Sequence, residues 1–156
     1  MKYLIIIFAI ILASCGGPSK SSFQSNFEND IEDFKDAWED ARDRSNNQRE
    51  NKVEEDMSSY VNENFGPGDK LEDFSCRVLK TYPNPLNLRC KSGSIIYALT
   101  LAEKWEGTLD LDRGDYITFG GIHSPTFSKT SSFKNKYDPS DPFFSIKKAC
   151  LEDQCK

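Results

Sequence analysis

The hydrophobic pattern of this chain changes at one point, Gly66-Pro67-Gly68, and that change limits the fold more than any other feature. Before it, apolar residues recur every three or four positions, which is the period of an amphipathic helix. After it, apolar and polar residues alternate in short runs bounded by turn residues, as expected for β-strands. Glycine and proline end helices. We therefore expect an α+β chain with an acidic helical segment at 23–65 and a β domain at 70–156.

The helical segment carries two apolar stripes. The first is Phe23, Phe27, Ile31, Phe34, Trp38 and Ala41, and the second is Val53, Met57, Tyr60, Val61 and Phe65. Residues 42–52 between them are polar, and Ser45-Asn46-Asn47-Gln48 fits a capping box. No glycine or proline enforces a break there, so one long helix and a helix pair both fit the sequence. We expect the stripes to pack against the chain's own domain.

The β domain contains five candidate strands. They are 74–79, 86–90, 95–101, 115–122 and a run that starts at Phe143. Tyr82-Pro83-Asn84-Pro85 forms a turn between the first two, and Gly120-Gly121 suits a bulge or a barrel corner. Five short strands with a glycine-marked bend predict a small antiparallel β-barrel.

Four cysteines fall within this β domain, and an even number is typical of disulfides in exported proteins. A hairpin centred on Pro83 places Cys76 opposite Cys90 on the apolar face, which predicts that they are bonded. The second predicted disulfide is Cys150–Cys155. It closes a much shorter loop and should therefore contribute less stability.

Residues 74–151 resemble the OB-fold in the variety found in small exported bacterial proteins. The likeness is carried by Leu109-Asp110-Leu111-Asp112-Arg113-Gly114-Asp115-Tyr116-Ile117-Thr118-Phe119-Gly120-Gly121, where Gly-Asp precedes an alternating strand that ends in glycine. Phe143 to Cys150 resembles the closing strand of that family. The resemblance implies an OB-like barrel with ligand contacts on the second and third strands and in two flanking loops.

The first residues have the features of an export signal. Lys2 gives a positive start, and the apolar run 3–13 is shorter than the roughly 20 residues of a membrane-spanning helix. Leu12-Ala13-Ser14-Cys15-Gly16 resembles the lipobox of bacterial lipoproteins. This resemblance implies removal of residues 1–14, lipid on Cys15 and a tether at 15–22. It also implies a lipid anchor in the cell membrane or outer membrane, facing the periplasm or the cell exterior, and Gly16 favours the outer membrane.

Charge is distributed unevenly along the chain. Residues 20–65 contain six basic and thirteen acidic side chains, whereas residues 66–156 contain thirteen basic and twelve acidic ones. The net charge of −5 makes nucleic acid an unlikely partner, because Lys and Arg dominate affinity for phosphate backbones. An acidic chain is not drawn to an anionic bilayer by charge, so the lipid must supply the anchor.

The sequence contains no recognisable catalytic set. His123 is the single histidine, and no nucleophile elbow is present. The cysteine spacing lacks the close ligand pairs of a zinc site. We therefore expect no enzymatic activity, no metal and no cofactor.

The most informative segment for binding is the long polar stretch 123–142. It interleaves aromatic and basic residues, namely Phe127, Lys129, Phe133, Lys134, Lys136 and Tyr137. We expect these to form a contact surface with Tyr82 and Tyr97 beside them, because such a mixture stacks on ligands and holds anions. Alternatively, its aromatic residues cover one end of the barrel.

The main functional hypothesis is a non-enzymatic binding module for a protein or an anionic glycan of the cell envelope. Two alternatives remain open from the sequence. One is an inhibitor or immunity protein that acts against a periplasmic enzyme or toxin. The other is a structural component of the envelope.

Overall fold

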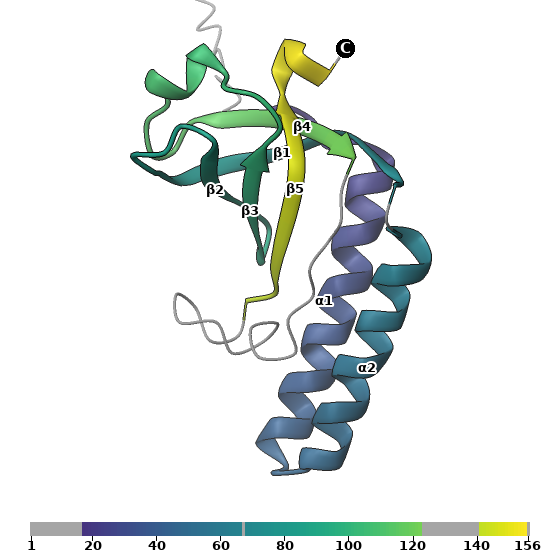
Figure 1. Cartoon of the computed structure of the whole chain (residues 1–156). Helices are drawn as coiled ribbons and strands as arrows, with labels where there is room; N and C mark the ends of the chain where they lie inside the picture. Colours follow the sequence, from purple (N-terminus) through teal and green to yellow (C-terminus); the bar gives the residue numbers. More distant parts are fainter. Residues whose placement is uncertain (1–16, 67, 123–140, 156) are drawn as a thin grey trace, which may run out of the picture.

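A computed structural model describes residues 17–66, 68–122 and 141–155. Two helices come first, α1 (Ser22–Asp43) and α2 (Asn47–Asn64). Five strands follow, β1 (Lys70–Thr81), β2 (Asn87–Ser92), β3 (Ile95–Leu101), β4 (Tyr116–Ile122) and β5 (Phe143–Leu151). Two short 3₁₀ helices are η1 (Glu106–Leu109) and η2 (Glu152–Cys155). The expected α+β order is confirmed, with the strands gathered into a barrel beside a helical hairpin (Figure 1).

The helical segment is a pair of helices, which resolves the choice that the sequence left open. Ser45 adopts a left-handed conformation (φ 54°), and this turns the chain sharply between α1 and α2. Asn46 then caps α2, because its side-chain oxygen accepts the N–H of Arg49 at 3.1 Å. The cap therefore lies one residue later than the first position of the predicted capping box.

The strands close into a barrel in the order β1-β2-β3-β5-β4. The expected five-stranded OB-like barrel is confirmed, but the expectation that all its strands are antiparallel is corrected. β3 and β5 run parallel, whereas the other neighbours are antiparallel. A closed ring of five strands cannot alternate direction at every step, because five is an odd number. One parallel pair is therefore unavoidable.

Both predicted disulfides are present, with Cα–Cα distances of 5.6 Å for Cys76–Cys90 and 5.1 Å for Cys150–Cys155. The hairpin register differs from the predicted one, because Val78 and not Cys76 is the partner of Cys90. A bulge shifts the pairing between Val78 and Lys80. Cys76 and Cys90 are both buried, so they bond diagonally across the two strands.

Gly120 and Gly121, which the sequence suited to a bulge or a barrel corner, lie opposite a register shift in β1 between Leu71 and Phe74. A Cβ at Gly120 would lie 2.8 Å from the carbonyl oxygen of Leu71, and Gly121 has φ +127°. A Cβ at Gly121 would also come within 2.4 Å of the Lys148 oxygen. Strands β1 and β5 thus approach β4 more closely than any larger residue allows.

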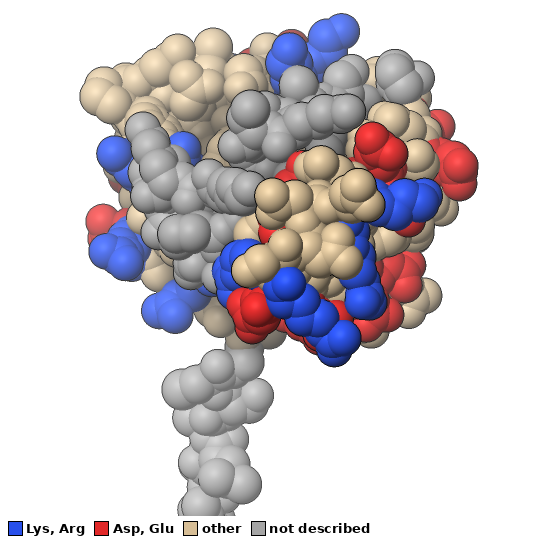
Figure 2. Space-filling view, turned by 90° about the horizontal axis from the view of Figure 1, so that it is seen from below, with Lys and Arg blue, Asp and Glu red and all other residues tan. Residues whose placement is uncertain are grey.

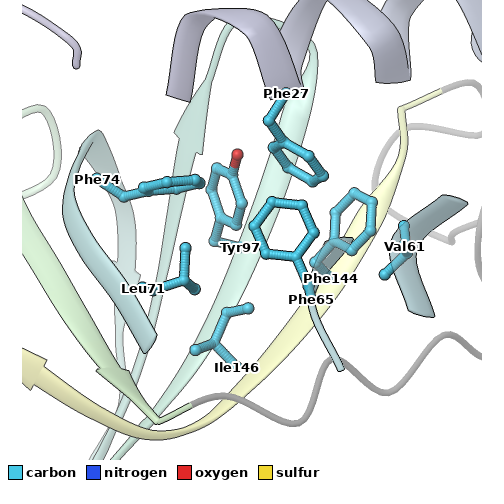
Figure 3. Close-up of a pocket in the computed structure, with 8 residues that line it drawn as sticks. All are labelled: Phe27, Val61, Phe65, Leu71, Phe74, Tyr97, Phe144 and Ile146. Carbon is cyan, nitrogen blue, oxygen red and sulfur yellow. The ribbon is translucent and has the colours of Figure 1, made fainter. Parts of the chain in front are cut away.

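The helical hairpin closes one end of the barrel with apolar side chains. Figure 3 shows them pointing toward one another from α1, the end of α2 and the strands; they are Phe27, Val61, Phe65, Leu71, Phe74, Tyr97, Phe144 and Ile146. The remaining void is about 10 Å³, roughly the space of one water molecule. This seam is therefore packed core and not a ligand cavity. Most of both predicted stripes is buried here or between the helices, although Phe23 remains 49% exposed.

One buried polar side chain, Gln24 of α1, joins the hairpin to the barrel. Its Oε1 accepts the N–H of Ser75 at 2.8 Å, and its Nε2 donates to the Ser75 oxygen at 2.7 Å. β2 pairs with β1 only from Arg77 onward. Gln24 thus replaces the missing strand partner of Ser75, as buried backbone groups require.

Candidate functional site

The outer surface of the barrel carries a row of alternating cations and aromatic rings. We call it the cation–π strip, made up of Lys80, Tyr82, Arg89 and Phe143. The Lys80 Nζ lies 5.0 Å from the Tyr82 ring centre. The Arg89 Cζ lies 5.8 Å from that ring and 5.4 Å from the Phe143 ring. These distances are those of cation–π contacts, so the rings and cations hold one another in place.

Strand pairing explains why these side chains share one surface. Lys80 of β1 is paired with Arg89 of β2, and Arg89 is paired with Ala98 of β3. Ala98 is in turn paired with Ser145 of β5. Successive side chains on a strand point to opposite faces, so this row faces outward while residues such as Leu88 fill the barrel. Ala98 of β3 has a small side chain, so Arg89 of β2 can reach across that strand to the Phe143 ring of β5.

A second basic row lies beside the strip. Arg77 of β1 is paired with Lys91 of β2, and Lys91 with Ile96 of β3. The ammonium of Lys91 binds the buried carboxylate of Asp141, which also lies 3.5 Å from the Lys35 Nζ of α1. Asp141 therefore fixes the start of β5 to both the barrel wall and the helical hairpin, directly before Phe143 of the strip.

Of the two tyrosines predicted for the contact surface, Tyr82 lies in the cation–π strip and is partly exposed. Tyr97 does not lie at the surface: it is only 1% exposed and fills the barrel, so its assignment is corrected. Its hydroxyl lies 3.4 Å from Glu28 Oε1 and donates to it. Burial, with the charge and hydrogen bond of Glu28, raises the pKa of Tyr97 well above its ordinary value.

The other predicted contact residues lie outside the described part of the chain. These are Phe127, Lys129, Phe133, Lys134, Lys136 and Tyr137, and the same is true of His123 and of the lipid acceptor Cys15. Their assignments stay predictions. The described chain resumes at Asp141, two residues before Phe143 of the strip.

Lys80, Arg89 and Phe143 were not singled out as binding residues from the sequence. The alternation of the second strand contains this signal for Arg89, which lies between the apolar residues Leu88 and Cys90. Residues out of phase with a buried set face outward. Lys80 is two residues after Val78 and therefore in phase with it, and only the bulge between them turns Lys80 outward. Phe143 carried no such signal, since its neighbour Phe144 is equally apolar and is the buried one of the two.

An acidic groove of about 430 Å³ lies between the two helices and is lined by Asp30, Asp33, Phe34, Ala37 and Tyr60. The Tyr60 hydroxyl donates to Asp30 at 2.6 Å, so two of the three polar side chains that line the groove are paired with each other. Figure 2, seen from the side of the hairpin turn, shows acidic side chains concentrated on one half of that face, with basic ones among them. The acidic groove therefore differs from the cation–π strip in charge as well as in position.

Within 17–66, 68–122 and 141–155, no group of three or more His, Cys, Asp or Glu side chains is arranged to hold a metal ion. No helix in those ranges is long and apolar enough to cross a bilayer.

The fold and the strip define a small disulfide-bonded α+β protein with an OB-like barrel. No known protein family, characterised protein or solved structure matches this chain.

Proposed function

We propose that this protein is a lipid-anchored binding protein of the bacterial cell envelope that holds an anionic glycan on the cation–π strip. The observation that carries the proposal is the strip itself, where Tyr82 and Phe143 are interleaved with Lys80 and Arg89 on the barrel wall. The lipobox-like sequence that ends at Cys15 supports the location.

The chemistry of the strip suits a sugar polymer that carries carboxylate or phosphate groups. Aromatic rings offer flat apolar faces to a sugar, and the guanidinium of Arg89 can bind a carboxylate or phosphate through two parallel hydrogen bonds. The row crosses four strands, roughly 15 Å at the usual strand spacing. That length suits several residues of an extended polymer better than a compact small molecule.

Binding of a generic acidic polysaccharide, heparin, to single-site variants tests this proposal. Lys80→Gln should weaken binding and reduce its salt dependence, because exposed charges are screened by salt. Tyr82→Ala should weaken binding without changing its salt dependence. Lys52→Gln removes the same charge from exposed α2 and should leave binding unchanged.

Three results would count against the proposal. Equal losses for Lys80→Gln and Lys52→Gln would mean that only net charge matters. Tighter binding of polyglutamate than of heparin would indicate that the strip binds an acidic protein and not a glycan. Binding that survives the loss of both Lys80 and Arg89 would show that the strip is not the binding site.

A further inference from the structure

A groove on the barrel wall lies beside the beginning of the described chain. It has a volume of about 410 Å³, and six of its lining residues are Pro18, Lys20, Arg77, Lys91, Gly93 and Tyr116. We call it the tether groove, because residues 17–20 belong to the segment expected to connect Cys15 to the helices. It borders the second basic row, next to the cation–π strip.

The described part of the tether is held against the protein. Gly17 packs on the ring of Tyr116, where a Cβ at Gly17 would lie 2.3 Å from the Tyr116 Cε1. The ammonium of Lys20 binds the carboxylate of Glu28 in α1. From Gly17 onward the tether therefore adds little to the distance between Cys15 and the folded protein. The helix α1 begins at Ser22, directly after it.

We propose that the tether groove faces the membrane and contacts the headgroups of anionic phospholipids. This inference rests on the proposed lipid anchor at Cys15. Cys15 is two residues from Gly17, so their Cα atoms are at most about 7 Å apart. A lipid on Cys15 thus brings Tyr116 and the groove to the bilayer surface.

The side chains of the groove suit that surface. Tyr116 is 50% exposed, and tyrosine is favoured at membrane–water interfaces because it combines an apolar ring with a polar tip. Arg77 donates its Nε–H to the Gly114 oxygen at 3.0 Å, and its two terminal nitrogens can bind a phosphate. The adjoining turn contains Asp112 and Asp115, and the Asp115 carboxylate accepts the N–H of Asp112. Charges of both signs therefore lie beside the groove, and the lipid on Cys15 and the ring of Tyr116 provide most of the attraction to the membrane.

This orientation also accounts for the distribution of charge. α1 has 22 residues and is therefore about 33 Å long. The barrel and the hairpin turn lie at opposite ends of the molecule (Figure 1). The groove includes Pro18 and Lys20, just before α1, so it lies at the barrel end of that helix and the hairpin turn lies at the other end. The segment 20–65 contains thirteen acidic and six basic residues. The acidic residues near the hairpin turn are then about a helix length from the groove, and so from an anionic surface that would repel them.

The test uses the full lipidated protein in vesicles of phosphatidylcholine and phosphatidylglycerol, after mass spectrometry has established lipid on Cys15. A dye is attached to Arg113→Cys, in the exposed turn beside the groove, or to Asn51→Cys, exposed near the hairpin turn. Lipids with a nitroxide on the headgroup quench only nearby dyes. We expect strong quenching at position 113 and none at position 51.

The double variant Arg77→Gln/Tyr116→Ser should stay lipidated and lose most of the quenching at position 113. Lys147→Gln, which removes one exposed charge from β5, is the matched control and should behave like the parent protein. Lipid on Cys15 with equal quenching at both positions, or with an unaffected double variant, would overturn the orientation alone. Absence of lipid on Cys15 would overturn the proposed anchor and this inference with it.

Discussion

Replacing Gln24 by leucine should destabilise the fold far more than the same replacement of an exposed glutamine at a similar position in a helix. Gln24 is 0% exposed and satisfies both backbone groups of Ser75, at 2.8 and 2.7 Å. Each buried polar group left without a partner costs about 1–3 kcal/mol. The variant, which leaves two such groups, should therefore lose about 2–6 kcal/mol of unfolding free energy, a large share of the 5–15 kcal/mol typical of a domain.

Urea unfolding with the disulfides intact measures this loss. For a slope of about 2 kcal/mol per molar urea, within the usual 1–3, the midpoint should fall by about 1–3 M. Gln48→Leu is the matched control, because Gln48 is exposed in the first turn of α2. Its midpoint should barely move. Equal midpoints for the two variants would show that Gln24 does not act as the strand partner of Ser75.

The two disulfides should differ in stability and reactivity. Loop lengths of 14 and 5 residues predict losses of about 3 and 2 kcal/mol in chemical denaturation when Cys76–Cys90 or Cys150–Cys155 is removed. Cys155 is exposed, whereas Cys76 and Cys90 are buried. Mild dithiothreitol should therefore reduce Cys150–Cys155 first, and peptide mapping that finds the opposite order would contradict the structure. Unfolding free energy should also fall with pH above about 10, the ordinary pKa of tyrosine, because the pKa of Tyr97 is raised in the fold and its ionisation is favoured on unfolding. A Tyr97→Phe variant should show a shallower decline, and an unchanged one would mean that Tyr97 does not contribute.

The periodic features of the sequence predicted the elements well. Helical stripes and alternating runs depend on local geometry, which a single sequence records. The same alternation places Tyr97 in phase with Ile95 and Leu99 in β3, so its burial could have been read from the pattern. Its aromatic character alone had suggested a surface role.

Features that depend on distant residues could not be predicted. Gln24 and Ser75 are 51 positions apart, and nothing near Gln24 indicates that it replaces a strand. The bulge after Val78 shifts the hairpin register without any glycine to mark it. The cation–π strip likewise needs Phe143 beside Arg89, a contact that only barrel closure creates.

The mass of the mature protein shows whether the proposed lipid anchor is present at Cys15. Protein extracted from bacterial membranes should begin at Cys15 and carry the added mass of acyl chains. A Cys15→Ala variant should lack that mass and leave the membrane fraction. A native protein that retains residues 1–14, or that begins at another residue and carries no lipid, would show that Cys15 is not a lipid anchor.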